Sequence, residues 1–165
     1  MRQDEIENAR GVRGQYNVVQ KPPAVFVLPV TDDGRVVLID TYRYTVDDWC
    51  LEVPAGRPKP HESLEDGART ELREEVGGTA RGLEHVGWFY SLNGICNEIC
   101  HVFLASGVAL GPTEHEPFEA IEPVPLAIAE ALALARRGEI RDAPSALALF
   151  LCEARLLELA GGVRR

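Results

Sequence analysis

Apolar and polar residues alternate along this chain in two different periods, and the change of period predicts its elements. Apolar runs at 24–30 and 35–40 flank the segment Thr31-Asp32-Asp33-Gly34, whose Asp-Gly pair is typical of a turn between two strands. Shorter apolar or alternating stretches predict four further strands, at 49–53, 82–89, 100–105 and 118–123. The elements predicted before residue 124 are therefore strands, interrupted by one helix.

That helix is predicted from a stripe of apolar residues at every fourth position. The stripe consists of Leu64, Ala68, Leu72 and Val76. Ser63 with Asp66 resembles a capping pair at the start of a helix, and Gly77 is a natural stop. Two more helices are predicted in the Ala- and Leu-rich segments 126–137 and 144–159. Strands covered by helices on both faces form an α/β/α sandwich.

Three glutamates lie within one turn of the first predicted helix. Glu71, Glu74 and Glu75 share a face because positions three and four apart are neighbours on a helix. Like charges so placed destabilise a helix by about 0.2–0.5 kcal/mol per pair. A hard divalent cation with oxygen ligands, Mg2+ or Mn2+, turns this cost into a binding site. A solvated charged face is the alternative, but the adjacent apolar stripe and glycine loop favour a metal site.

Length, charge and cysteine usage narrow the class of protein. A chain of 165 residues with 45% apolar content buries one core and leaves little room for a second. The net charge of −9, without a basic stripe, argues against nucleic-acid and membrane-surface binding. A phosphate substrate stays compatible because metal ions bridge carboxylates to anions. Four cysteines without CxxC spacing, and an N-terminus without an apolar core, predict reduced thiols in a cytoplasmic protein.

The stretch from Gly56 to Gly78 resembles the Nudix box, in which Gly, five residues, Glu and seven residues precede Arg-Glu-apolar-x-Glu-Glu-x-Gly-apolar. Seven positions are in register here: Gly56, Glu62, Glu71, Leu72, Glu74, Glu75 and Gly77. Gly78 stands where the family has an apolar residue, and Thr70 replaces an Arg that braces a metal-binding Glu. The resemblance implies a Nudix-type α/β/α sandwich with a mixed β-sheet and a loop-helix-loop, in one domain over residues 1–165.

Outside the box the chain is similar to ADP-ribose and ADP-sugar pyrophosphatases over most of residues 18–159. The matching segments are Pro23-Ala24-Val25, Tyr42-Arg43-Tyr44, Leu51-Glu52-Val53-Pro54-Ala55-Gly56, and Glu98 with His101, Phe103 and Ala105. The resemblance implies that the Ala55 carbonyl, Glu71 and Glu75 hold the metals. It implies that Glu74 is a further ligand or orients water, and that Glu98 is a general base. It also implies two substrate-binding residues, Arg43 and Glu52.

These implied roles predict hydrolysis of a pyrophosphate bond with Mg2+, or Mn2+ as a substitute. The expected substrate is ADP-ribose or another ADP-sugar, which would yield AMP and a sugar phosphate. Asn93 stands where ADP-ribose enzymes commonly carry Pro, so NADH, FAD and GDP-mannose are kept as alternatives. Thr70 leaves open a nucleotide sensor without turnover, although such a sensor need not keep the glutamate cluster. The resemblance also implies a homodimer, with residues 1–20 as an N-terminal arm that contacts the partner.

Overall fold

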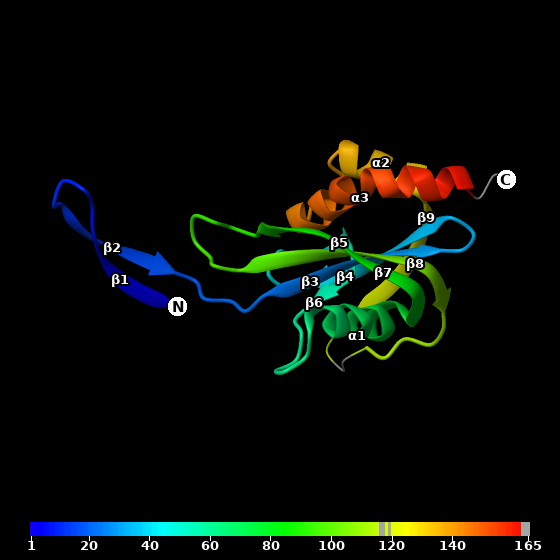
Figure 1. Cartoon of the computed structure of the whole chain (residues 1–165), viewed down its shortest axis with the longest axis horizontal. Helices are drawn as coiled ribbons and strands as arrows, with labels where there is room; N and C mark the ends of the chain where they lie inside the picture. The colour runs from blue at the N-terminus through cyan, green and yellow to red at the C-terminus, as the bar shows by residue number, and fades with distance from the viewer. Residues whose placement is uncertain (116–117, 119, 163–165) are drawn as a thin grey trace.

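A mixed β-sheet with helices on both faces forms the body of the molecule (Figure 1). The computed structural model describes residues 1–115, 118 and 120–162. The strands of the body are β3 (Ala24–Thr31), β4 (Arg35–Arg43), β5 (Asp48–Glu52), β6 (Ala55–Gly56), β7 (Gly78–Tyr90), β8 (Ile99–Leu110) and β9 (Ile121–Ala127). The helices are α1 (Leu64–Val76), α2 (Ile128–Arg136) and α3 (Ala143–Gly162). In the described part of the chain, none of them is long and apolar enough to cross a membrane.

The sheet runs in the order β5-β4-β3-β8-β7, with β6 paired to β3 and β9 paired to β4. Only β3 and β8 are parallel, whereas the other described pairings are antiparallel. Along β3, Val25 and Val27 pack in a core with α1, whereas Phe26 and Leu28 pack in a second core with α2 and α3. Successive side chains of a strand point to opposite faces, so this buried strand separates the two cores. The predicted α/β/α sandwich with a mixed sheet is confirmed.

Helix α1 begins and ends at the residues that the sequence indicates. The Ser63 hydroxyl accepts a hydrogen bond from the Asp66 amide at 3.1 Å, which satisfies a free N–H group of the first turn. Gly77 ends the helix with a φ of 65°, a left-handed conformation that glycine adopts without strain. Three members of the apolar stripe are buried, and Leu64 is half-buried; the buried ones are Ala68, Leu72 and Val76. The loop-helix-loop of the box therefore forms as predicted.

Several element boundaries differ from the sequence expectation. Strands β7 and β8 extend well beyond 82–89 and 100–105, because they pair with each other over almost their whole length. The strand expected at 118–123 lies at Ile121–Ala127, and residue 119 lies outside the described residues. This strand contains Pro123 and Pro125, which are tolerated because β9 pairs with β4 alone among the described strands.

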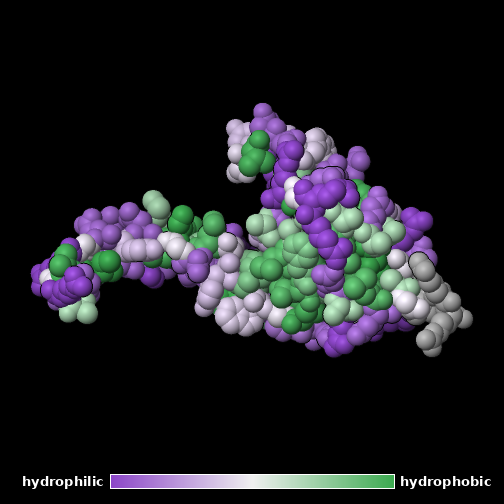
Figure 2. All heavy atoms as spheres, turned by 90° about the horizontal axis from the view of Figure 1, so that it is seen from above, coloured by the Kyte–Doolittle hydropathy of each residue, from purple (hydrophilic) through white to green (hydrophobic). Residues whose placement is uncertain are grey.

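The N-terminal residues form a hairpin of their own. Strands β1 (Arg2–Glu7) and β2 (Arg13–Val18) pair only with each other among the described strands. Figures 1 and 2 show the hairpin projecting from the body as an arm. At its base, the Tyr16 hydroxyl donates to the Gly94 carbonyl at 2.5 Å, and the Val19 amide donates to the Ile95 carbonyl at 2.8 Å. The arm is thus fastened to the loop 91–98 between β7 and β8.

Candidate active site

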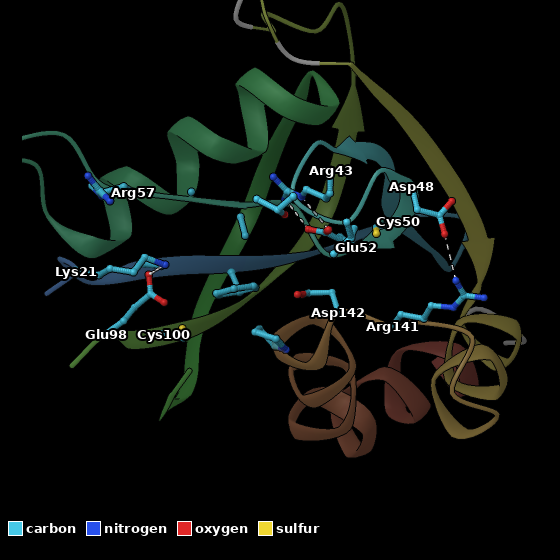
Figure 3. Close-up of a pocket in the computed structure, with 17 residues that line it drawn as sticks. Lys21, Arg43, Asp48, Cys50, Glu52, Arg57, Glu98, Cys100, Arg141 and Asp142 are labelled. Atoms are coloured by element: carbon cyan, nitrogen blue, oxygen red, sulfur yellow. Dashed lines mark hydrogen bonds and ion pairs between the residues drawn. The ribbon is translucent and has the colours of Figure 1, made fainter. Parts of the chain in front are cut away.

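A pocket with a volume of about 710 Å³ lies where several strand ends meet the start of α3 (Figure 3). The segment before β3, the β4–β5 connection, β6, the start of β8 and the loop before α3 all contribute to its walls. Four of the site residues predicted from the sequence line it: Arg43, Glu52, Ala55 and Glu98. The fold therefore brings together residues that are up to 55 positions apart in the chain, as Arg43 and Glu98 are.

Arg43 and Glu52 contact each other across the antiparallel pair β4 and β5. The Arg43 Nε donates to Glu52 Oε1 at 2.9 Å, and Nη2 donates to Oε2 at 2.5 Å. A carboxylate as buried as Glu52, which is 6% exposed, needs such a partner. The hydrogen bonds to Glu52 also raise the pKa of Arg43, so the guanidinium stays charged in the pocket. The two residues thus act as one unit, with the Nη1 donors of Arg43 still available.

Glu98 enters the pocket from the loop before β8. The residue is 7% exposed, and Oε1 lies 2.5 Å from the Lys21 Nζ. The Lys21 amide donates to the Asn97 side chain at 2.9 Å, so Lys21 is held on this loop through its backbone as well. The almost buried Glu98 carboxylate therefore has an ion-pair partner in Lys21. Sequence reasoning found Glu98 but missed Lys21, which belongs to a segment without a recognisable pattern.

Two box glutamates reach strand β6 at the edge of this pocket. Glu75, which is buried, accepts a hydrogen bond from the Ala55 amide at 2.8 Å. The Glu71 carboxylate lies so close to Gly56 that a Cβ there would come within 2.2 Å of its Oε1. Glycine at position 56 is therefore a requirement of this contact, because any side chain would overlap the carboxylate. The structure thus places Glu75 against Ala55 and Glu71 against the adjacent Gly56, whereas their role as metal ligands stays a prediction.

Glu74 lies apart from this group. Its carboxylate contacts the Lys59 Nζ at 3.0 Å and the Arg73 Nη2 at 3.5 Å. These cations reduce the like-charge repulsion that the sequence predicts for Glu74. Over residues 1–115, 118 and 120–162, no three His, Cys, Asp or Glu side chains are grouped so that they could hold an ion as they stand. The all-oxygen donor set of Glu71, Glu75 and the Ala55 carbonyl nevertheless fits a hard divalent cation.

Thr70, at the position of the family's Arg, still contacts a box carboxylate. Its hydroxyl donates to Glu62 Oε1 at 2.9 Å, and Glu62 Oε2 accepts from the Lys59 amide at 2.8 Å. Thr70 itself is only 9% exposed. A neutral hydroxyl donor therefore holds Glu62 where the family has a charged Arg. Sequence comparison showed the loss of the charge but could not show this contact.

The start of α3 supplies pocket residues that sequence reasoning missed. Asp142 Oδ2 accepts from the Ser145 amide at 2.9 Å and from its hydroxyl at 2.6 Å, and so caps the helix. The buried Ser145 hydroxyl also accepts from the Val53 amide at 3.0 Å, which ties α3 to the segment before β6. Arg141 pairs with Asp48 at 3.2 Å. An Asp before an Ala-rich run indicates a cap, but nothing in the sequence indicates that the cap faces a pocket.

The cysteine thiols do not offer a nucleophile in this pocket. All four cysteines are free, and Cys50 and Cys100 are part of the pocket wall. Burial raises the pKa of Cys100 to about 11, and burial also raises the pKa of Cys50. Both thiols are therefore protonated near neutral pH, and the thiolate is the reactive form. The chemistry of the pocket rests on its carboxylates and cations.

Comparison with known proteins agrees with the fold. The NUDIX domain family model matches residues 20–146. The chain is 33% identical over 148 residues to an ADP-ribose pyrophosphatase of Bacillus subtilis (strain 168), covering 88% of this chain and 80% of that protein. It is 29% identical over 151 residues to a methanol dehydrogenase activator of Bacillus methanolicus, with the same coverage of 88% and 80%. A crystal structure of an ADP compounds hydrolase matches with a TM-score of 0.82 and 25% identity, covering 93% of this chain and 84% of that chain.

The chain therefore belongs to the Nudix hydrolase family. It is a hydrolase that acts on pyrophosphate bonds of nucleoside diphosphate derivatives. The family assignment made from the box residues is confirmed.

Proposed function

We propose that this protein hydrolyses the pyrophosphate bond of ADP-ribose or another ADP-sugar in the presence of Mg2+, giving AMP and a sugar phosphate. One observation carries the proposal: Glu71 and Glu75 meet β6 at the edge of a pocket that also holds Arg43 and Glu98. The similarity to an ADP-ribose pyrophosphatase and to an ADP compounds hydrolase supports an ADP-linked substrate.

The metal ligands in this proposal are the Ala55 carbonyl, Glu71 and Glu75, and Mn2+ is the expected substitute for Mg2+. Bound divalent ions neutralise phosphate oxygens and lower the pKa of a coordinated water. Glu74 is proposed as a further ligand or as a group that orients water. Either role requires that Glu74 release Lys59, which now lies 3.0 Å away.

Glu98 is proposed as the general base that takes a proton from the attacking water. Its place in the pocket supports this role, because a general base must lie within hydrogen-bond reach of the water whose proton it takes. Arg43 is proposed to donate from Nη1 to the substrate while Glu52 fixes the plane of the guanidinium through the other two nitrogens. Positioning and charge compensation are the main contributions that a protein makes to this type of reaction.

The experiment that tests the proposal is incubation with Mg2+ and a substrate panel, followed by chromatographic identification of products. The panel contains ADP-ribose, an ADP-hexose, NADH, FAD and GDP-mannose. We expect ADP-ribose or the ADP-hexose to be cleaved fastest, with AMP as one product. Faster cleavage of NADH, FAD or GDP-mannose would refute the ADP-sugar assignment and make that compound the substrate. Binding without turnover of any member would support the sensor alternative and refute the enzyme.

A substitution in the metal-binding group tests the site itself. We expect Glu75→Gln to lower metal-dependent kcat by on the order of 100-fold or more, because Gln keeps the shape but loses the charge that holds the ion. Gln also retains an oxygen that can accept from the Ala55 amide, so thermal unfolding should change little. The matched control is Glu65→Gln on the exposed face of the same helix, where Glu65 pairs with Arg69. Unchanged turnover in Glu75→Gln would remove Glu75 from the site.

We also propose that the protein is a homodimer that uses the N-terminal arm. The arm projects from the body, and both Ile6 and Tyr16 are nearly half exposed on it. A two-stranded hairpin of this kind is marginally stable in water unless something packs against it. A second copy of the chain would supply that packing.

A further inference from the structure

Most cations in the pocket are already engaged by carboxylates. Three ion pairs form its walls, and each joins residues that are distant or on different elements. The pairs are Lys21–Glu98, Arg43–Glu52 and Arg141–Asp48, with N–O distances of 2.5, 2.5 and 3.2 Å. An anionic ligand that approached one of these cations would meet a carboxylate that already neutralises its charge. Because each of them already pairs with a carboxylate, we do not expect these cations to be the main phosphate-binding groups of the pocket.

Arg57 differs from the other cations of the pocket. It lines the pocket and is exposed, and it makes no ion pair or side-chain hydrogen bond with any residue in the part of the chain that the structure describes. Its guanidinium is permanently charged and offers five N–H donors. A planar fork of donors matches two oxygens of a phosphate better than a point charge does. Arg57 can therefore bind a phosphate without breaking an existing contact.

Arg57 lies next to the expected reaction centre because of its position in the chain. It follows β6 directly, so one peptide separates it from Gly56, on which the Glu71 carboxylate lies. In Figure 3, Arg57 and Arg141 lie on opposite sides of the pocket, with Arg43 between them. Lys21 and Glu98 are on the side of Arg57. The pocket thus has one end beside the box glutamates and another end beside α3.

We infer that Arg57 is the principal diphosphate-binding residue of this enzyme and that it sets the direction in which the substrate lies. Its guanidinium donates to non-bridging oxygens of the diphosphate beside β6. One organic part of the substrate then extends across the Arg43–Glu52 pair toward Arg141 and Asp142. The inference rests on the proposed function, because it requires a substrate with a pyrophosphate linkage.

Kinetics of Arg57 variants test this role. We expect Arg57→Ala to raise the KM for ADP-ribose by on the order of 10-fold to 100-fold, the usual range for losing a hydrogen bond between charged groups. Arg57→Lys keeps the charge but not the fork, so its KM should lie between those of Arg57→Ala and the wild type. Arg137→Ala is the matched control, because Arg137 is an exposed arginine outside the pocket that pairs with Glu139. Its KM should equal that of the wild type.

Competitors separate a phosphate contact from a structural effect. We expect Arg57→Ala to weaken inhibition by ADP at least as strongly as it raises KM, to weaken inhibition by AMP less, and to leave inhibition by adenosine unchanged. Thermal unfolding should change little as well, because Arg57 makes no ion pair or side-chain hydrogen bond with the residues that the structure describes. Equal loss of inhibition by all three competitors, or a KM within twofold of the wild type, would overturn the inference.

Failure of this inference is distinguishable from failure of the proposed function. If the wild type cleaves a panel substrate and Arg57→Ala does so with the same KM, only the role of Arg57 is refuted. If the wild type cleaves nothing, ADP binding measured by calorimetry replaces KM as the readout. Weaker ADP binding by Arg57→Ala would then support the phosphate contact, and equal binding would refute it.

Discussion

At the scale of single residues, Thr70 makes a contact that its place in the sequence does not reveal. An Arg-to-Thr replacement removes a charge, and sequence alone therefore predicts an unbraced glutamate. The structure instead provides a hydrogen bond of 2.9 Å to Glu62 from a hydroxyl that is almost buried. Residue identity shows which charges are present, but the partner of a short polar side chain depends on helix and loop positions.

This contact makes Thr70→Val a sharp test, since valine preserves the shape and removes the hydroxyl. We expect the free energy of unfolding, measured by urea denaturation, to fall by about 1–3 kcal/mol, because Glu62 loses a partner in a partly buried place. Turnover should fall as well if Glu62 helps to hold the box loop. Thr70→Ser keeps the hydroxyl and should stay close to the wild type. Equal free energies of unfolding for Thr70→Val and the wild type would show that this hydrogen bond does not stabilise the fold.

At the scale of elements, local sequence signals predicted α1 well. They predicted poorly those strands whose extent depends on pairing with distant parts of the chain. Ser63, the apolar stripe and Gly77 act within a few residues, so the sequence was sufficient to place both ends of α1. Strands β1 and β2 carry mostly charged and polar residues, and no apolar alternation indicated them. The extra length of β7 and β8 comes from their mutual hydrogen bonds, which a periodicity within one strand does not contain.

A contact between β7 and β8 predicts a pH dependence of stability. The His85 Nε2 and the His101 Nδ1 lie 3.2 Å apart, and the His85 ring packs against Phe103 at a centroid distance of 5.0 Å. Burial and the nearby His85 lower the pKa of His101 below its ordinary value of 6.5. A histidine with a lower pKa in the folded state binds fewer protons when folded than when unfolded. The contribution of His101 to the free energy of unfolding is therefore fully present above its pKa in the unfolded chain. This contribution is lost as the pH falls through the lower pKa that His101 has in the folded protein.

We expect the urea midpoint of the wild type to decrease when the pH is lowered from about 7.5 to about 5.5, because His101 binds more protons in the unfolded state than in the folded state. His101→Gln cannot titrate and should show a shallower decrease over the same range. His61→Asn, which removes an exposed histidine elsewhere, should keep the slope of the wild type. Identical slopes for His101→Gln and the wild type would contradict the assigned cause.

At the scale of the whole molecule, the fold class followed from the box and from the order of strands and helices, whereas the pocket did not. The box is contiguous, so its register can be read from one stretch of sequence. The pocket depends on contacts such as Arg141 with Asp48, which are 93 residues apart, and Glu98 with Lys21. Such pairs form only after the sheet and α3 are in place, and no spacing rule links them. Resemblance pointed to Arg43, Glu52 and Glu98. The pairing of Arg43 with Glu52, the partner Lys21 and the place of Arg57 came from the structure.

The N-terminal arm leads to a prediction for the assembled molecule. We expect the wild type to elute in size-exclusion chromatography with light scattering at twice its chain mass of 18.1 kDa. Ile6 on β1 is 46% exposed, and burying it against a second copy would favour association through the hydrophobic effect. Ile6→Asp places a charge in that contact and should shift the protein to a single chain, whereas Ile6→Val should remain dimeric. A monomeric wild type would refute the homodimer, and a dimeric Ile6→Asp variant would move the interface away from the arm.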